Sequence, residues 1–185
     1  MHNQNFTPFP VLVTERLILR QLSLEDENQI FLLRSDAEVN KFLDRPAATS
    51  LEDARQFIIK INDSISRNES LYWGINLKND PCLIGTICLW NLSIEENKAE
   101  LGYEMLPSFQ GQGLMQEAVF KVLQFGFETM QLRTIEGWPR ADNSSSIKLL
   151  EKNNFERDMG AESKMPAEEK LAGMLIYALT KNKMT

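Results

Sequence analysis

The fold is decided by one stretch of the sequence, Glu104-Met105-Leu106-Pro107-Ser108-Phe109-Gln110-Gly111-Gln112-Gly113-Leu114-Met115. A strand pattern leads into this stretch and a helical pattern starts at its end, so it joins a strand to a helix through a loop with two glycines. Glycine allows the tight, positive-φ backbone of such a loop. The first turn of a helix presents unpaired N–H groups and a positive dipole end, which suits a phosphate or pyrophosphate. The glycines alone leave a plain strand-to-helix turn as the alternative.

Two better-known phosphate loops are excluded by the residues present. A dinucleotide-binding loop needs a third glycine where Gln116 stands. A Walker loop needs glycine, lysine and then serine or threonine, and this loop contains no lysine. A nucleotide-binding protein is therefore the weakest of the functional classes that the loop allows.

The patterns around the loop predict one α+β domain. Residues 71–78, 82–93 and 98–106 are rich in β-branched and aromatic residues, which predicts three strands. Short polar connections at 79–81 and 94–97 make these strands an antiparallel meander, while β-α-β crossovers enter the rest of the sheet. The other predicted elements are a strand over 15–22, a helix from residue 23 to about residue 33, a helix from residue 50 with apolar positions through residue 65, a helix from residue 113 through residue 125, a strand over 132–137, a helix over 144–153, a short strand over 155–159 and a long strand over 170–181.

Composition sets further limits. The 185 residues, 43% of them hydrophobic, suffice for one domain with a substantial core, so we predict a single domain over 1–185 with residues 1–10 as a flexible tail. The 20 Lys and Arg residues against 26 Asp and Glu give a net charge of −6. We expect no nucleic acid and no membrane as partners, because phosphate groups are neutralised by clustered cations and this chain is acidic.

The histidine and cysteine content excludes other chemistries. The one histidine, His2, stands in the N-terminal tail, which excludes histidine-assisted serine or cysteine catalysis and histidine-bound zinc; we expect no metal. Cys82 and Cys88 fall on one predicted strand about 20 Å apart, too far for a disulfide, so we expect two buried thiols in a reducing compartment. The sequence shows no signal-peptide pattern and no apolar run long enough to span a membrane, so we expect a cytoplasmic location.

Several segments resemble one family of enzymes. Gln110-x-x-Gly113-x-Met115 resembles the Gln/Arg-x-x-Gly-x-Gly/Ala acetyl-CoA motif of the GCN5-related N-acetyltransferases (GNAT). Met115 departs from this pattern, but one branch of the family often has methionine there. Asn154 stands where the family usually has glycine, and asparagine tolerates the left-handed backbone expected at that position. This branch is that of the RimJ/RimL-like ribosomal-protein N-terminal acetyltransferases. The resemblance to it covers residues 11–181, and the matching segments occur in the same order as in the branch. They are residues 14–20, 99–104, 110–118, 143–146 and 149–155.

The resemblance implies a GNAT fold, in which a mixed, mostly antiparallel central sheet splays between its fourth and fifth strands and is flanked by helices. It implies acetyl-CoA as the co-substrate, with the pantetheine arm lying between these two strands like an added strand. Backbone groups at the end of the fourth strand would bond the pantetheine amides and the acetyl carbonyl, and the loop amides would hold the pyrophosphate. The residues implied to contact acetyl-CoA are Met105, Leu106, Gln110, Gly111, Gln112, Gly113, Leu114, Met115 and Asn143.

The reaction that the resemblance implies is direct attack of a neutral amine on the thioester. An amine with a pKa of about 8 to 10 must first lose a proton, so a carboxylate base is useful. Glu104, nearest the splay, is the first candidate; Glu100, on the same strand face, and Glu162 are the alternatives. Ser146 matches the serine to which family mechanisms assign stabilisation of the thiolate leaving group.

The resemblance leaves the acceptor open. It is a protein N-terminal amine or a small amine such as a polyamine, an amino acid or an aminoglycoside, and a non-catalytic acyl-CoA-binding or regulatory module is the alternative function. Residues 1–140 hold 19 acidic and 13 basic residues, whereas residues 141–185 hold seven of each. The first part includes the two helices expected to frame the acceptor groove, so we predict a cationic acceptor. The apolar last strand leaves monomer and homodimer open.

Overall fold

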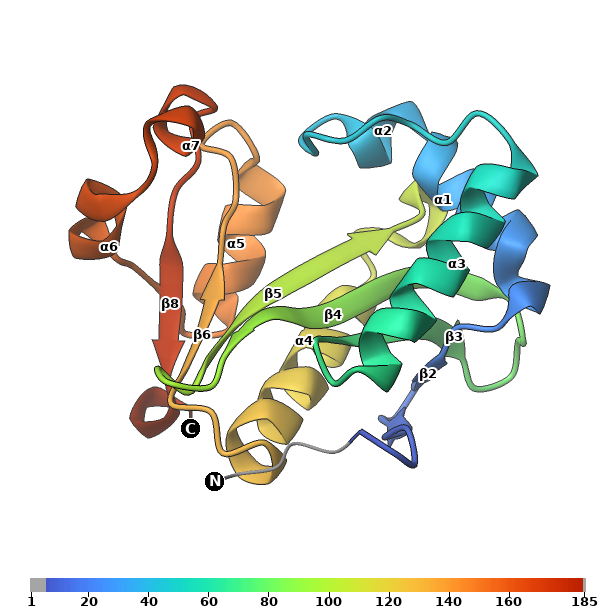
Figure 1. Cartoon of the computed structure of the whole chain (residues 1–185), viewed down its shortest axis with the longest axis horizontal. Coiled ribbons are helices and arrows are strands. Elements are labelled where there is room, and N and C mark those ends of the chain that lie inside the picture. Colours follow the sequence, from blue (N-terminus) through green and yellow to red (C-terminus); the bar gives the residue numbers. More distant parts are fainter. Residues whose placement is uncertain (1–5, 185) are drawn as a thin grey trace.

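One mixed sheet organises the chain. The computed structural model describes residues 6–184, in which eight strands are ordered β1-β2-β3-β4-β5-β6-β8-β7 (Figure 1). All neighbouring strands are antiparallel except β5 and β6, which confirms the predicted mixed and mostly antiparallel sheet. The strands are β1 Leu12–Val13, β2 Leu17–Gln21, β3 Leu71–Leu77, β4 Leu83–Ser93, β5 Lys98–Met105, β6 Thr134–Gly137, β7 Glu156–Arg157 and β8 Tyr177–Thr180.

The parallel strands β5 and β6 pair only near their starts. Their pairing runs from Lys98 opposite Thr134 to Glu100 opposite Glu136 and then ends, although β5 stays paired with β4 as far as Met105. The second half of β5 therefore has a free edge toward β6, and Figure 1 shows the two strands diverging. The sequence patterns missed the short strand β1, so the strands predicted as the fourth and the fifth are β5 and β6 in the structure.

Helices cover both faces of the sheet. Helices α1 and α3 share an apolar cluster that includes Ile30, Leu33 and Ile58, and α4 packs into the larger core through Ala118 and Val122. Figure 1 shows α3 in front of the sheet and α4 behind it. Within residues 6–184, none of the helices has the length and apolar character needed to cross a bilayer. The helices are α1 Glu27–Ser35, α2 Ala37–Asn40, α3 Leu51–Ser66, α4 Leu114–Gln124, α5 Ser144–Lys152, α6 Met159–Lys164 and α7 Ala167–Leu171.

The capping patterns read from the sequence are present. The hydroxyl of Ser50 accepts a hydrogen bond from the N–H of Asp53 at 3.2 Å, and the Asp53 carboxylate accepts one from the N–H of Ser50 at 3.0 Å, which caps α3. The corresponding box at Ser23 opens a 3-10 turn, Leu24–Asp26, that leads into α1. Asn154 has a φ of +63°, which confirms the expected left-handed backbone.

The long strand predicted over 170–181 is wrong. Helices α6 and α7 lie before and within this region, and only Tyr177–Thr180 forms a strand. Pro166 stands at the N-cap of α7, and Gly173 has a φ of +71° that interrupts extended backbone. The apolar residues of the segment suggested one continuous strand, but the helix that starts after Pro166 runs into it, and the turn at Gly173 leaves only a shorter strand.

The end of the predicted N-terminal tail packs against the domain. Phe6 is buried in the main core, and the indole N–H of Trp73 donates to the carbonyl of Pro10 at 2.7 Å. This differs from the flexible tail predicted for residues 1–10, because the aromatic side chains there have a surface to cover. The earlier part of that tail, including His2, lies outside the described residues.

The two cysteines have different surroundings. Cys82 is exposed and lies just before β4, so the prediction of a buried thiol is wrong at this position. Cys88 lies within β4 and is buried, as predicted, and burial raises the pKa of its thiol above the usual range.

Candidate active site

Two glycines shape the loop between β5 and α4. Gly111 and Gly113 have φ values of +74° and +76°, a region that other residues enter only with strain. A Cβ atom at Gly111 would meet nothing within 4 Å, and one at Gly113 would meet Arg16 Nη2 at 3.5 Å. The space next to the loop backbone is therefore open to a ligand.

The loop also offers unused backbone donors. Within residues 6–184, no hydrogen bond uses the N–H groups of Gly111, Gln112 or Gly113. Helix α4 begins at Leu114, so the N–H groups of its first turn have no partner inside the helix. The donors and the positive end of the helix dipole suit the negative charge of a pyrophosphate, so these residues fit the part of acetyl-CoA that the resemblance assigns to them.

A clamp formed by Thr14, Arg16 and Glu117 fixes the loop to the first strands. Glu117, in the first turn of α4, accepts hydrogen bonds from Thr14 Oγ1 at 2.5 Å and from Arg16 Nε at 2.6 Å. Arg16 Nη1 also donates to the carbonyl of Gln112 at 3.0 Å. The clamp thus joins two of the segments that carry the resemblance, residues 14–20 and 110–118.

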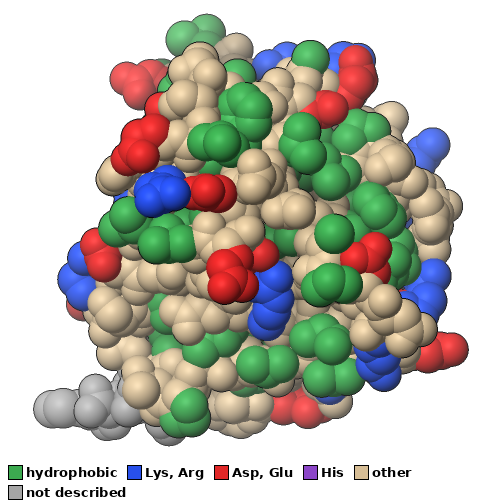
Figure 2. All heavy atoms as spheres, turned by 90° about the vertical axis from the view of Figure 1, so that its right-hand side faces the viewer, with side chains coloured by type: hydrophobic (Ala, Val, Ile, Leu, Met, Phe, Trp, Pro, Cys, Tyr) green, Lys and Arg blue, Asp and Glu red, His purple; other side chains and the backbone are tan. Residues whose placement is uncertain are grey.

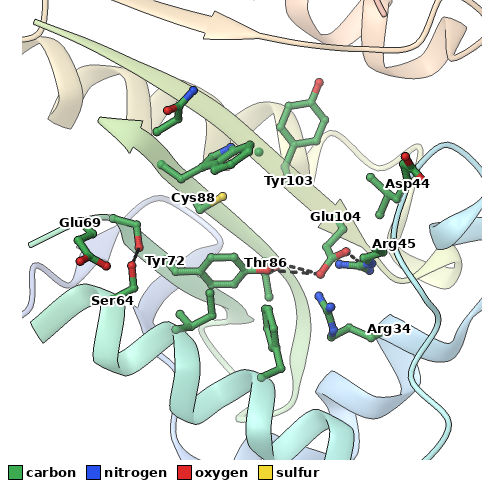
Figure 3. Close-up of a pocket in the computed structure, with 17 residues that line it drawn as sticks. Arg34, Asp44, Arg45, Ser64, Glu69, Tyr72, Thr86, Cys88, Tyr103 and Glu104 are labelled. Atoms are coloured by element: carbon green, nitrogen blue, oxygen red, sulfur yellow. Dashed lines mark hydrogen bonds and ion pairs between the residues drawn. The ribbon is translucent and has the colours of Figure 1, made fainter. Parts of the chain in front are cut away.

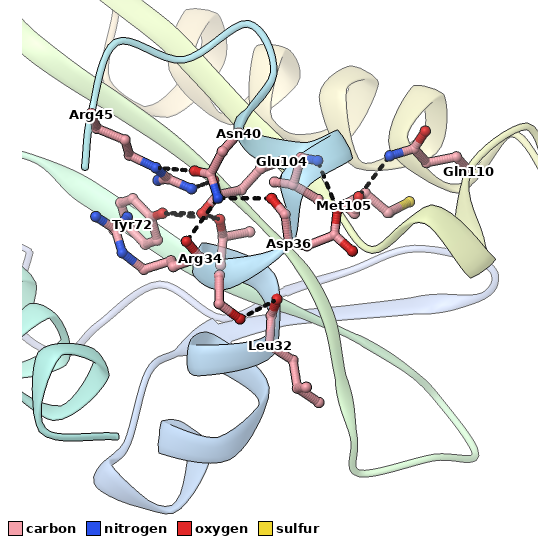
Figure 4. A network of polar contacts seen from close by, with 12 residues as sticks. Leu32, Arg34, Asp36, Asn40, Arg45, Tyr72, Glu104, Met105 and Gln110 are labelled. Carbon is pink, nitrogen blue, oxygen red and sulfur yellow. Dashed lines mark hydrogen bonds and ion pairs between the residues drawn. The ribbon is translucent and has the colours of Figure 1, made fainter. Parts of the chain in front are cut away.

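The free edge of β5 ends at Met105. The N–H of Leu106 donates to the carbonyl of Ile84 on β4 at 3.0 Å, so the alternating pattern of an antiparallel pair turns the backbone groups of Met105 away from β4. The Met105 carbonyl accepts a hydrogen bond from Gln110 Nε2 at 2.8 Å (Figure 4). The carbonyl of Leu106 accepts from the N–H of Phe109 at 3.0 Å. Both backbone groups of Leu106 are therefore used within the protein, and the N–H of Met105 faces the splay.

Asn143 and Ser146 lie at the start of α5, on the other side of the splay. Asn143 caps the helix by accepting the N–H of Ser146 with its Oδ1 at 3.1 Å. The hydroxyl of Ser146 lies 2.8 Å from the hydroxyl of Tyr103 on β5, so a pair of hydroxyls bridges the splay. Burial raises the pKa of Tyr103 to about 12, so this phenol carries its proton at neutral pH. The sequence patterns gave Tyr103 no functional role.

A cavity of about 530 Å³ opens beside the end of β5, within the usual size range of ligand pockets. Its walls come from α1, α3, the loop after α2, and strands β3, β4 and β5. Gly102 widens this pocket, because a Cβ atom there would lie 2.9 Å from Cys88 Sγ. Strand β5 thus lines the pocket and also leads into the glycine loop.

Three side chains hold the Glu104 carboxylate inside the pocket, as Figure 3 and Figure 4 show. Its Oε2 lies 2.5 Å from Arg45 Nη2, and its Oε1 accepts hydrogen bonds from Thr86 Oγ1 at 3.2 Å and from the Tyr72 hydroxyl at 3.4 Å. The hydroxyls of Tyr72 and Thr86 lie 2.9 Å apart. Burial, with the neighbouring charge of Glu104, raises the pKa of Tyr72 well above its usual value, so the phenol donates rather than ionises.

The two alternative carboxylates differ from Glu104. Glu100 shares its strand but lies nearer the paired start of β5, where burial and the neighbouring charge of Glu136 raise its pKa to about 7. Glu162 lies in α6, where it pairs with Arg157 at 2.8 Å and accepts the N–H of Ile176 at 3.1 Å. Of the three carboxylates, only Glu104 lines the pocket.

Four side chains around Glu104 were not predicted from the sequence. Arg34 belongs to α1, Arg45 to the loop after α2, Tyr72 to β3 and Thr86 to β4. They stand far apart in the chain and belong to no short motif, so no local signal marks them. The three-dimensional fold brings them together.

The acidic residues of the first helices do not gather at the pocket. Figure 2 shows acidic side chains interspersed with basic and hydrophobic ones over the face formed by this part of the molecule. Within residues 25–53, the one acidic side chain that lines the pocket is that of Asp44. Four of the others are engaged within the protein, as ion pairs or helix caps: Asp26 with Arg20, Glu27 with Arg55, Asp36 at α2 and Asp53 at α3.

Fold and site together define a class of protein. The sheet splays beside a free strand edge, an open loop of unused N–H groups follows that edge, and a pocket with a buried carboxylate lies next to it. These features fit a transferase that holds a CoA thioester and an acceptor side by side. No group of three or more His, Cys, Asp or Glu side chains suited to a metal ion occurs within residues 6–184.

The chain belongs to the acetyltransferase (GNAT) domain family, which matches residues 16–156. It is 33% identical over 171 residues to the uncharacterized N-acetyltransferase p20 of Bacillus licheniformis, covering 92% of this chain and 96% of that protein. Its fold is similar to that of a GNAT-family acetyltransferase from Bacillus anthracis, with a TM-score of 0.77 and 22% identity over 94% of this chain and 99% of the other. It is also similar to spermidine N-acetyltransferase from Vibrio cholerae in complex with CoA and spermine, with a TM-score of 0.74 and 17% identity over 91% and 97% of the two chains. The predicted GNAT fold is confirmed, and the chain is an acetyl-CoA-dependent N-acetyltransferase.

Proposed function

We propose that this enzyme transfers the acetyl group of acetyl-CoA directly to a primary amine while both substrates are bound. One observation carries the proposal: the pocket that contains Glu104 opens at the strand whose free edge leads into the glycine loop. An amine in the pocket and a thioester at this edge would be neighbours. Direct transfer then needs no acetylated side chain as an intermediate.

The residues proposed to hold acetyl-CoA lie on both sides of the splay. We assign the pantetheine arm to the backbone of Met105 and to Asn143, whose Nδ2 makes no hydrogen bond within the described residues. Gln110 holds the Met105 carbonyl in place. The N–H of Leu106 would need its bond to Ile84 to open before it could contribute, whereas its carbonyl, like that of Met105, can accept a second hydrogen bond. The backbone amides proposed for the pyrophosphate are those of Gly111, Gln112, Gly113, Leu114 and Met115.

We propose Glu104 as the general base. It is the candidate carboxylate that lines the pocket, and Tyr72 and Thr86 fix the direction of its Oε1. Acetyl-CoA supplies the activated thioester, and Glu104 would accept the proton of the amine, directly or through a water. Ser146, bonded to Tyr103, would donate a proton to the leaving thiolate or stabilise its charge.

The acceptor is proposed as a protein N-terminal amine or a small amine. The clamp between residues 14–20 and 110–118 supports the RimJ/RimL-like branch, because it uses residues of both segments that resemble this branch. The spermine complex of the Vibrio cholerae enzyme supports a small amine, since that enzyme has the same fold. The prediction of a cationic acceptor relied on the acidic residues of the first helices, and within residues 25–53 Asp44 alone of these lines the pocket, beside Arg34 and Arg45.

A screen of primary amines tests the proposal. The purified protein is incubated with acetyl-CoA and each amine, and the released thiol and the acetylated product are both measured. We expect thiol release that depends on the amine and falls in Glu104→Gln and Ser146→Ala. Full turnover in both variants would show the two assignments to be wrong. Tight binding of acetyl-CoA without transfer to any amine would favour the non-catalytic acyl-CoA-binding module instead.

A further inference from the structure

The inner end of the pocket contains two guanidinium groups and one carboxylate. Arg45 is paired with Glu104, and it also donates to Asn40 Oδ1 at 2.9 Å. Arg34 extends from α1 into the same space, and Figure 3 shows its guanidinium pointing toward Glu104 and Arg45. Within residues 6–184, no hydrogen bond or ion pair joins the Arg34 guanidinium to another group. The positive charge of this region therefore exceeds its negative charge.

Glu104 makes its contacts with other groups and none with Arg34. Its Oε2 is bound to Arg45, and its Oε1 accepts from Thr86 and Tyr72. The other acidic side chains of the pocket lie elsewhere or are engaged: Asp44 is exposed, and Glu69 is paired with Arg67 at 2.8 Å. Burial and the neighbouring charge of Arg45 lower the pKa of Arg34, and the charge of Glu104 offsets this lowering only in part, so the partly buried cation is incompletely compensated.

The position of Arg34 is fixed in a way that leaves its donors free. Its guanidinium carbon lies 3.8 Å from the centre of the Phe57 ring on α3. Such a contact uses the flat face of the guanidinium, whereas its N–H donors lie in the plane and along the edge. The Phe57 ring thus holds the group while its fork of donors remains available to a carboxylate or phosphate.

We propose that Arg34 forms an anion subsite in the acceptor pocket, so that the acceptor is a zwitterion: an amine that also carries a carboxylate or a phosphate. The amine lies by Glu104 and the anionic group lies on the edge of Arg34. This inference rests on the proposed function and names the acceptor class of the same site. It also accounts for a pocket that has a carboxylate for the amine and an unpaired guanidinium beside it.

Matched acceptors test the subsite. Each pair differs in the anionic group alone: L-alanine and L-alaninamide, O-phosphoethanolamine and ethanolamine, and the peptide amides Ala-Glu-NH2 and Ala-Gln-NH2. Rates are compared as kcat/KM for the neutral amine, which removes differences in amine pKa. We expect at least one anionic member to be preferred about 10- to 100-fold, the value of one hydrogen bond to a charged group. The pair that shows the preference identifies the anionic group of the acceptor as the carboxylate of an amino acid, a phosphate or the acidic side chain of a peptide.

Two arginine variants separate the subsite from general effects. Arg34→Gln should remove the preference, so that the two members of each pair are acetylated at similar rates. Arg55→Gln, on α3 and paired with Glu27 outside the pocket, is the matched control and should keep the preference. If Arg34→Gln is shown by melting to be poorly folded, the wild-type preference and the Arg34→Lys variant, which keeps the charge, carry the test.

Calorimetry distinguishes failure of this inference from failure of the proposed function. The same pairs are titrated into wild-type enzyme saturated with CoA, where no turnover is needed. Equal affinities within every pair, together with equal rates, would overturn the anion subsite even if amines are acetylated. A preference for the anionic member with no acetyl transfer would support the subsite and overturn the proposed function.

Discussion

The two substrate sides of this enzyme are built in different ways. The side proposed for acetyl-CoA consists of the end of β5, the glycine loop and the start of α4, and it presents mainly backbone groups. The side proposed for the acceptor is lined by α1, α3, the loop after α2 and one face of β3, β4 and β5, and it presents side chains such as Arg34, Arg45 and Glu104. Backbone groups recognise a constant ligand through shape and N–H donors. Side chains can vary without changing the fold, so the acceptor side is where specificity can change.

The largest effect is expected on the acceptor side. Glu104→Gln should lower kcat by about 100- to 10,000-fold, the usual contribution of general base catalysis, because the amide cannot accept the proton of the amine. The affinity for acetyl-CoA, measured by calorimetry, should change little, since Glu104 is not among the residues proposed to bind it. Glu69→Gln, a pocket residue paired with Arg67, is the control and should keep its rate. A Glu104→Gln enzyme with normal kcat would contradict the assignment of the general base to the acceptor side.

The next largest effect is expected on the acetyl-CoA side. Gly113→Leu should weaken acetyl-CoA binding at least about 100-fold, because a side chain at this φ of +76° strains the loop and covers its amides, and each hydrogen bond to a charged group is worth about 1.5 to 3 kcal/mol. Calorimetry with acetyl-CoA measures the change. Gly173→Leu is the matched control: its φ is +71° and its surroundings are open, so the backbone strain is similar but the affinity should be retained. If both variants lost affinity for acetyl-CoA equally, the loss would come from impaired folding and not from covered loop amides.

The sequence predicted these two sides unequally, for a physical reason. A backbone site needs glycine at positions of positive φ and a strand and helix around them, and each of these leaves a local pattern such as Gly111 and Gly113. The meander of β3, β4 and β5 and helices α3, α4 and α5 were predicted for the same reason, since periodicity and capping are local. The pocket proposed for the acceptor depends on contacts between residues such as Arg45 and Glu104, which are far apart in the sequence. No local pattern records such contacts, so of this network Glu104 alone was identified.

Local patterns also failed where the chain changes direction within a few residues. Helix α2 has four residues and strand β1 has two, which is too short for a periodicity to be recognised. Over 170–181, apolar residues suggested one long strand, but α7 extends into the start of this segment and the backbone turns at Gly173 before the shorter strand β8. Glu162, the third candidate base, lies within α6 and forms an ion pair with Arg157.

The pH dependence of stability distinguishes the roles of Glu100 and Glu104, the two candidate carboxylates on β5. Burial raises the pKa of Glu100 to about 7, so the folded state holds a proton there that the unfolded chain releases near pH 4.5. The contribution of Glu100 to the free energy of unfolding should therefore be most favourable below about pH 4.5. It should fall as the pH rises toward 7, by at most about 3 kcal/mol. Glu100→Gln should remove this fall, which denaturant unfolding at pH 5 and pH 8 can measure.

The same variant separates Glu100 from Glu104 in the reaction. If Glu104 is the base, Glu100→Gln keeps most of its turnover and gains stability at pH 8 but not at pH 5. If turnover is lost while stability is gained, Glu100 is the base and the acceptor amine must lie nearer the paired start of β5. A variant whose stability is unchanged at both values of pH would contradict the buried, protonated Glu100.

The smallest effect tests whether the acetyl-CoA side depends on side chains at all. Glu117→Gln removes the charge that binds Thr14 and Arg16, so the clamp weakens but the loop keeps its glycines. KM for acetyl-CoA should rise about 10-fold, the value of one weakened charged hydrogen bond, while kcat at saturation stays nearly constant. Glu128→Gln, in the segment that follows α4, is the control. A change in kcat without a change in KM would mean that the clamp acts on the chemical step, and the two sides would then be coupled through α4 rather than built independently.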